Sequence, residues 1–300
     1  MAVFRILWIL AFLAAFVAFW ATGIGHLAVH LLVLKLSDNG SDHPRLGLET
    51  YTLSAPPVTI GDVKANLSGL TFSLETGTLL STINRPPEII EFTTTGVLIR
   101  RIPVVGLRDL EGITHVDASR FILVDEAENA LHWVNITPDT TQVDVKDSPF
   151  LKLERSPFKN MGFEALSWHG ASNSLWVGQE MWPLRITKIS GLDTDALVTG
   201  PRISVTSWGP KLLVKGSLMD LSSLTVSEQT GNIILLSDLT SAVFEFAPDG
   251  TPVGFLPLWS GYSGLSDNVP QAEGVALSSD GDLYIISEPN LFYLFRQSQE

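Results

Sequence analysis

The chain has 300 residues, of which 45% are hydrophobic, contains no cysteine and carries a formal net charge of −13. This length provides enough apolar surface for one sizeable core or two small ones. The absence of cysteine excludes disulfides, thiolate zinc sites and a cysteine nucleophile. The negative charge argues against nucleic acid as a partner, because an acidic surface repels phosphate. Cations or basic partners suit such a surface better.

The first 36 residues differ in kind from the rest. From Ile6 to Leu36 the chain is almost wholly apolar, which is long enough to cross a bilayer. We therefore expect residues 1–36 to form an uncleaved N-terminal transmembrane anchor. Two alternatives stay open: a cleaved export signal, or a helix from Ile6 to Ala21 followed by an interfacial helix bearing His26 and His30. Either way, the remainder of the chain is expected to be exported.

A polar linker at residues 37–47 leads into five similar segments within residues 48–300. In each segment a small or acidic residue opens an apolar strand, a turn follows, a second strand ends in an acid or amide, and a third strand completes the pattern. The segments are Ser68–Asn84, Glu111–Glu126, Glu164–Glu180, Ser222–Asp238 and Glu273–Glu288. They start about 40–60 residues apart, a period typical of propeller blades.

Strand and turn signals inside the segments agree with this repeat. Short runs rich in β-branched and aromatic residues, such as Phe121–Val124 and Leu283–Ile286, indicate buried central strands. The predicted fold class is therefore all-β: a five-bladed β-propeller of four-stranded antiparallel blades, preceded by the transmembrane helix. Because the last segment ends after its third strand, Leu48–Leu53 is expected to supply the missing outer strand and to close the ring.

Acidic side chains recur at two places in these segments, the start of the innermost strand and the end of the second strand. Both places lie at the same end of an up-and-down blade, so the acids should converge on one mouth of the central channel. On the innermost strands, the residues expected to bind a metal directly are Glu111, Glu164 and Glu273. A second tier at the same mouth comprises Glu126, Glu180, Asp238, Glu288, Ser68, Asn84 and Ser222.

Carboxylates packed together are costly unless they are protonated or neutralised by a cation. Oxygen ligands without cysteine or clustered histidine suit calcium or magnesium better than zinc or copper. We expect calcium, because it tolerates about six to eight irregularly placed oxygens. The alternative is a solvated rim of acids that hydrogen-bond backbone N–H groups of neighbouring blades. No catalytic residue is identified, and His115, His132 and His169 are interpreted as structural.

Four stretches resemble the SdiA-regulated (YjiK-like) family. They are Asp109-Leu110-Glu111-Gly112-Ile113, Gly162-Phe163-Glu164-Ala165-Leu166, Gln271-Ala272-Glu273-Gly274-Val275-Ala276 and Ser287-Glu288-Pro289-Asn290-Leu291-Phe292-Tyr293. The resemblance covers about residues 58–296 and implies a five-bladed propeller, distantly related to NHL-repeat propellers, with a calcium site and no established biochemical activity. It also implies an N-terminal membrane segment and a place outside the bacterial cytoplasm. Ala165 departs from the glycine that follows the acid in other copies.

Two functions are carried forward as hypotheses. The first is a membrane-anchored, extracytoplasmic calcium-binding propeller that acts as a binding or scaffold module for an unknown small-molecule, glycan or peptide ligand. The second is a metal-assisted hydrolase of phosphoesterase, esterase or lactonase type, in which the metal polarises a carbonyl or phosphoryl oxygen. No separate histidine or lysine base is identifiable in the repeats, so enzyme activity stays open. The expected location is the cell inner membrane, with the propeller in the periplasm or outside the cell.

Overall fold

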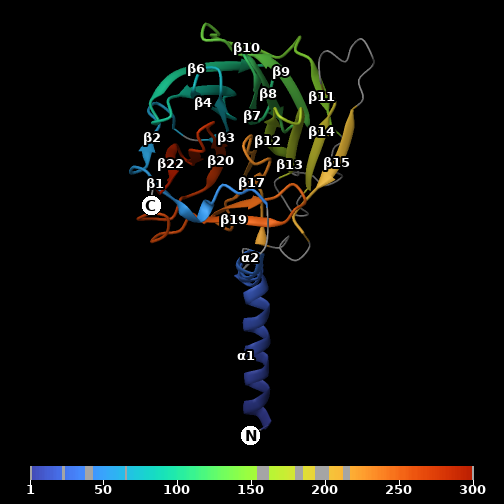
Figure 1. Cartoon of the computed structure of the whole chain (residues 1–300), viewed down its shortest axis with the longest axis vertical. Coiled ribbons are helices and arrows are strands. Elements are labelled where there is room, and N and C mark those ends of the chain that lie inside the picture. Colours follow the sequence, from blue (N-terminus) through green and yellow to red (C-terminus); the bar gives the residue numbers. More distant parts are fainter. Residues whose placement is uncertain are drawn as a thin grey trace.

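The computed structural model describes residues 2–21, 24–37, 43–64, 66–153, 162–179, 185–192, 203–211 and 217–298. In this part of the chain, five blades, each of four antiparallel strands, stand around a common centre (Figure 1). From the innermost strand outward, the first blade contains β3 (Leu67–Ser73), β4 (Thr78–Ile83), β5 (Glu88–Phe92) and β6 (Leu98–Val105). The second blade contains β7 (Leu110–Asp117), β8 (Arg120–Asp125), β9 (Ala130–Asn135) and β11 (Phe150–Lys152).

The remaining three blades follow the same order, from the innermost strand outward. They are β12 (Phe163–His169), β13 (Ser174–Gln179), β14 (Arg185–Ser190) and β15 (Ser204–Trp208); β16 (Ser223–Val226), β17 (Ile233–Ser237), β18 (Ala242–Phe246) and β19 (Pro252–Pro257); and β20 (Ala272–Leu277), β21 (Leu283–Ser287), β22 (Leu291–Gln297) and β1 (Tyr51–Leu53). At the rim, β2 (Val58–Thr59) pairs with β22 and β10 (Val143–Asp144) pairs in parallel with β6. The prediction of an all-β, five-bladed propeller is confirmed.

The ring closes as the sequence predicts, with an N-terminal strand completing the last blade. Strand β1 pairs antiparallel with β22, and Leu53 lies opposite Phe295. The strand is shorter than predicted because Leu48–Thr50 form a 3₁₀ turn, η1, after Gly47 in a left-handed conformation (φ 72°). This turn allows both Leu48 and Tyr51 to be buried in the core. The closing blade thus leaves no long unpaired edge at the junction of the chain ends.

The inner strands approach one another closely. The second residue of each repeat must therefore be small. A Cβ on Gly69 would lie 2.7 Å from the carbonyl oxygen of Glu111, and one on Gly112 would lie 2.7 Å from that of Glu164. Ala165 occupies the equivalent place on β12, where it is buried. The small residue that recurs in the sequence motif therefore marks backbone-to-backbone contact around the channel.

Hydroxyl groups join the inner strands in the order β3, β7, β12, β16 and β20. In each case a backbone N–H of one strand donates to a threonine or serine of the preceding strand. The bonds run from His115 N to Thr71 Oγ1 (3.0 Å), Trp168 N to Thr114 Oγ1 (2.8 Å), Val226 N to Ser167 Oγ (3.0 Å) and Val275 N to Ser223 Oγ (3.2 Å). Strand β20 in turn contacts β3, and five hydrophobic clusters fill the spaces between neighbouring blades.

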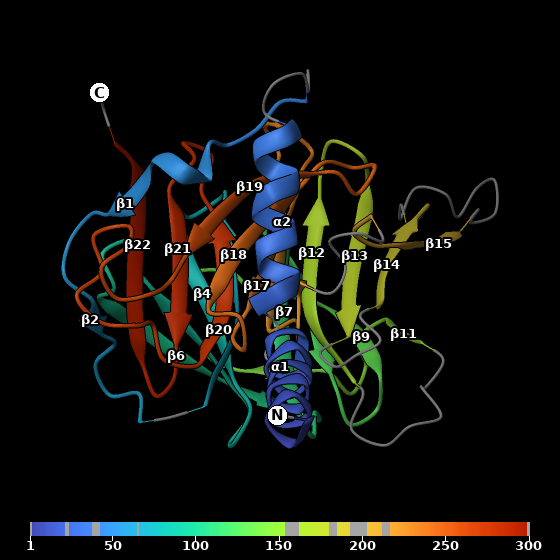
Figure 2. The same ribbon diagram turned by 90° about the horizontal axis from the view of Figure 1, so that it is seen from below.

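The single transmembrane helix predicted over residues 1–36 is not found in the structure. The described residues of this apolar run form two helices, α1 (Ala2–Ala21) and α2 (Ile24–Ser37). Among the described residues, no helix combines the length and the apolar character that a membrane crossing requires. Instead, α2 lies against β19 (Figure 2). Its His30 is fully buried, with the imidazole edge-on to the ring of Phe244 at 4.9 Å.

The apolar side chains of α2 thus pack against a blade. Leu27, Val33 and Leu34 lie against the hydrophobic cluster of β16–β19. Helix α1 behaves differently, because it extends away from the propeller (Figure 1). Its side chains Trp8 and Phe12 are each 71% exposed. The continuous apolar run in the sequence therefore divides into one helix that packs on the propeller and one that does not.

Replacing Gly112 by alanine should lower the free energy of unfolding by about 1–3 kcal/mol, because the new Cβ would be forced against the backbone of β12. Gly61→Ala is the matched control, since an added Cβ there meets nothing within 4 Å. Denaturant unfolding of both variants measures the difference. Equal stability of the two variants would show that the inner strands are not held as closely as described.

Candidate metal centre

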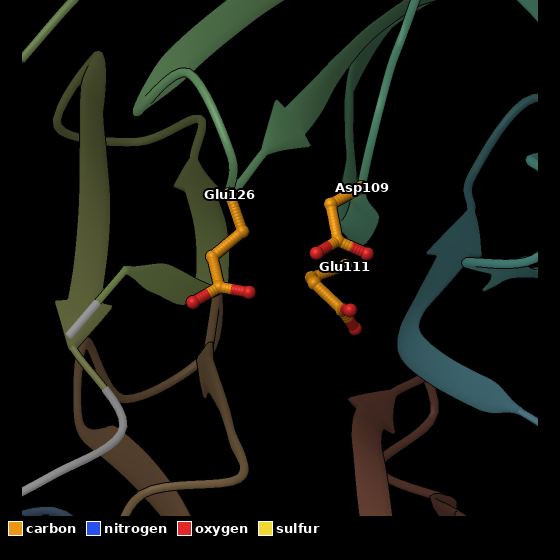
Figure 3. A group of neighbouring side chains, drawn as sticks. All are labelled: Asp109, Glu111 and Glu126. Carbon is orange, nitrogen blue, oxygen red and sulfur yellow. The ribbon is translucent and has the colours of Figure 1, made fainter. Parts of the chain in front are cut away.

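Three carboxylates from one blade lie together at the mouth of the channel where the inner strands begin (Figure 3). Oxygen atoms of Asp109, Glu111 and Glu126 all lie within 4.8 Å of one another. Asp109 precedes β7, Glu111 is its second residue, and Glu126 follows β8. The end of this hairpin is fixed by a 2.9 Å hydrogen bond from Glu126 N to the Asp109 carbonyl.

A β-bulge presents the Glu111 side chain at this mouth. Leu110 pairs with Asp125 and Gly112 pairs with Val124, which leaves Glu111 as the extra residue between them. Bulges re-aim side chains and often lie beside functional sites. The same irregularity falls at Glu164 on β12 and at Glu273 on β20.

The preceding blade supplies partners for Glu111 across the blade boundary. Asn84 Nδ2 donates a 2.9 Å hydrogen bond to Glu111 Oε1, and Ser68 Oγ donates a 2.8 Å bond to the Glu111 carbonyl oxygen. Two residues of the predicted second tier therefore contact one predicted metal ligand. Arg85 contributes a long ion pair to Asp109, 3.5 Å from Nη2 to Oδ2, although the arginine side chain is 73% exposed.

Burial raises the pKa of Glu111 from its ordinary value to about 7. Hydrogen bonds from Asn84 and Ser68 oppose this rise, whereas the nearby carboxylates of Asp109 and Glu126 add to it. The raised pKa is the expected result of crowding carboxylates in a site with little solvent. A bound cation would reverse it, because a positive charge favours the ionised form.

Two buried oxygen atoms at this site lack a hydrogen-bond donor in the described part of the chain. They are Asp109 Oδ1 and Asn84 Oδ1. Leaving a buried acceptor unsatisfied costs roughly 1–3 kcal/mol. Carboxylate and amide oxygens are ligands that calcium and magnesium prefer. The residues present therefore fit a hard divalent cation, which would satisfy these oxygens and neutralise the carboxylates.

The other predicted positions divide into several groups. Glu164 and Glu273 open β12 and β20 as expected but are not part of the three-carboxylate group. Glu180 lies outside the described residues. The assignment of Glu111, Glu164 and Glu273 as direct metal ligands stays a prediction. Glu126, which was expected in a second tier, has a carboxylate oxygen within 4.8 Å of oxygens of both Glu111 and Asp109.

Asp238, Glu288 and Ser222 occupy their predicted places at the ends of neighbouring strands. Asp238 Oδ1 accepts a 3.1 Å hydrogen bond from Ala272 N in the next blade. Burial raises the pKa of both Asp238 and Glu288. Ser222 Oγ accepts a 3.2 Å bond from Asp238 N and so supports the turn.

Sequence reasoning missed Asp109 because the repeat pattern considered only the opening acid and the acid after the second strand. Asp220 stands in the corresponding place before Ser222, two residues upstream. It is buried and accepts bonds from Ser237 Oγ and from the backbone of Asp238 and Leu239. The available signal was the pair of acids in Asp109-Leu110-Glu111. Two acids so close together at the start of a strand lie at the same mouth of the channel.

Three solved structures are distantly similar to this chain, each with a TM-score below 0.5. A gluconolactonase from Xanthomonas campestris has a TM-score of 0.49 at 12% identity, covering 82% of this chain and 94% of that one. Virginiamycin B lyase from Staphylococcus aureus has a TM-score of 0.41 at 15% identity, covering 82% and 74%. A chain of a nidogen/laminin complex has a TM-score of 0.45 at 12% identity, covering 74% and 72%.

The sequence itself is more informative than these distant likenesses. The family model described as SdiA-regulated matches residues 45–296, which include the whole propeller from the closing strand to the last blade. The prediction made from the glutamate motifs is confirmed, and the chain belongs to the SdiA-regulated family.

Proposed function

We propose that the protein is a binding or scaffold module in which calcium fixes the geometry of one mouth of the propeller. The observation that carries this proposal is the approach of Asp109, Glu111 and Glu126 to within 4.8 Å. The unsatisfied oxygens of Asp109 and Asn84 support it, because a cation at this place would satisfy both of them. Four side chains leave part of a calcium coordination shell of about six to eight oxygens open. A peptide, glycan or small molecule would supply oxygens there.

A metal-assisted hydrolase is the second candidate, favoured by one feature of the same site. Burial places the pKa of Glu111 at about 7, within the range of a general acid or base. A cation beside it would polarise a carbonyl or phosphoryl oxygen. Calcium-dependent turnover of an ester, lactone or phosphoester, lost in Glu111→Gln, would favour this candidate over the binding module.

We also propose that α1 holds the propeller at a lipid surface, with the propeller on the periplasmic or outer side of the bacterial inner membrane. The proposal rests on the large apolar side chains that α1 exposes to solvent, including Trp8 and Phe12. Large apolar side chains that are exposed together favour contact with another apolar surface. Lipid would cover α1 while α2 keeps its contact with β19.

Calcium should raise the melting temperature of the protein, because a ligand that binds only the folded state stabilises it by mass action. At a calcium concentration 100-fold above Kd, the expected rise is roughly 5–10 °C. Asp109→Asn should abolish most of this rise in differential scanning calorimetry, whereas Asp139→Asn, an exposed acid, should preserve it. An equal loss in Glu273→Gln would instead place the ion between the inner strands.

Without metal, the free energy of unfolding should fall as pH rises from about 4.5 to about 7. The reason is that Glu111 has a pKa of about 7 in the folded chain, so the folded state holds its proton more tightly than the unfolded state does. The contribution of this group is on the order of 3 kcal/mol. Urea unfolding across this pH range should show this decrease of the unfolding free energy in the wild type and a smaller decrease in Glu111→Gln. Parallel curves would contradict the assignment.

The full chain should float with vesicles of phosphatidylethanolamine and phosphatidylglycerol in a density gradient. Phe12→Asp should weaken this association, since a charge on α1 opposes contact with acyl chains. Val97→Asp is the control, because Val97 is an exposed apolar residue on the propeller, between β5 and β6. If both variants float like the wild type, α1 is not the membrane contact.

A further inference from the structure

The opposite mouth of the channel, where the inner strands end, contains a pocket of about 460 Å³. Each inner strand contributes the side chain four residues after the opening residue of its repeat. These five side chains are Phe72, His115, Trp168, Val226 and Leu277. Because the acids lie at the start of the same strands, the two mouths differ in chemistry. One mouth is lined by carboxylates and the other by a mainly apolar cup.

The rim of this cup is polar and carries one acid. Glu228 and Gln229 follow β16, while Ser278 and Ser279 follow β20. Among the described residues that line the pocket, there is no lysine or arginine. The volume lies within the range of about 300–1,000 Å³ that small-molecule sites occupy. An anionic ligand would find no positive side chain here.

Glu228 is held in place by backbone groups of the neighbouring blade. Its Oε1 accepts a 2.6 Å hydrogen bond from Gly170 N, and its Oε2 accepts a 3.2 Å bond from Ala171 N. The side chain is nevertheless 44% exposed, so both oxygens retain capacity for another donor. The carboxylate is thus positioned but not enclosed.

No cation neutralises Glu228 within the described part of the chain. Its one ion-pair neighbour there is His169, whose Nε2 lies 3.6 Å from Glu228 Oε2, beyond hydrogen-bonding distance. Burial lowers the pKa of His169, which disfavours the charged imidazolium beside Glu228. The rim therefore presents a carboxylate that forms no ion pair with a lysine or arginine among the described residues.

We propose that this second mouth binds a small organic cation, an ammonium group attached to an apolar or aromatic body. The ammonium group donates to the carboxylate of Glu228, and the body fills the cup beside Phe72 and Trp168. Charge-assisted hydrogen bonds are stronger than neutral ones. Aromatic side chains contribute both apolar contact area and attraction for a cation. This site is separate from the metal centre and does not depend on the function proposed for it.

Three ligands of matched shape test the proposal on the full chain by isothermal titration calorimetry. They are 2-phenylethylamine, the neutral 2-phenylethanol and the anionic 3-phenylpropionate. The amine should bind about tenfold more tightly than the alcohol, the effect of one charge-assisted hydrogen bond. The carboxylate should show no binding. Equal affinities for all three, or no binding of the amine, would overturn the proposal.

Variants separate the charge of Glu228 from its support of the fold. Glu228→Gln should reduce the affinity for the amine to that for the alcohol and leave alcohol binding unchanged. Gln229→Glu should raise the affinity for the amine, which keeps the test decisive if Glu228→Gln unfolds. Asp109→Asn, at the other mouth, should leave amine binding unchanged. Unaltered amine affinity in both rim variants would overturn the assignment.

Discussion

The close packing of five inner strands around one axis is the constraint on which the rest of the structure depends. Gly69 and Gly112 let one backbone approach the next, at points where a Cβ would lie 2.7 Å from a carbonyl oxygen. Hydroxyl groups such as Thr114 then accept backbone N–H groups of the following strand. Each innermost strand has no further strand of its own sheet on the channel side. The backbone N–H groups on that edge therefore donate to these hydroxyl groups instead. The inner strands are thereby fixed in register relative to one another, and so are the side chains at both ends of them.

The two mouths follow from this shared register, and they place different demands on the fold. At the first mouth, Asp109, Glu111 and Glu126 crowd together, and burial raises the pKa of Glu111 to about 7. A site of this kind is unfavourable for the apo protein and is stabilised by a cation. At the second mouth, a mostly apolar cup has Glu228 at its edge, held by Gly170 N. Opposite ends of the same strands therefore carry the acidic cluster that we propose holds a metal ion and the pocket that we propose binds an organic cation.

The N-terminal segment shows how one sequence property can serve two physical roles. Apolar residues continue from α1 into α2, yet α2 buries His30 against the phenylalanines of β18 and β19. Burial lowers the pKa of His30 to about 4, so the imidazole is neutral in that contact. The chain that follows is then held to the same blade, because Glu245 Oε1 accepts bonds from Leu46 N and Asn232 Nδ2. Hydropathy alone does not distinguish lipid from a blade as the apolar partner.

The sequence by itself determined the repeat, the five blades and the closing strand near Leu53, because strand period and turn chemistry are local properties. Only the tertiary structure decided which acids meet. Asp109 joins Glu111 and Glu126 because a bulge and a hairpin end converge there, and Asn84 reaches them from another blade. The division of the N-terminal run, like the Glu228 contact with the preceding blade, was also decided by packing. Such contacts depend on distances between segments far apart in sequence, which no local pattern encodes.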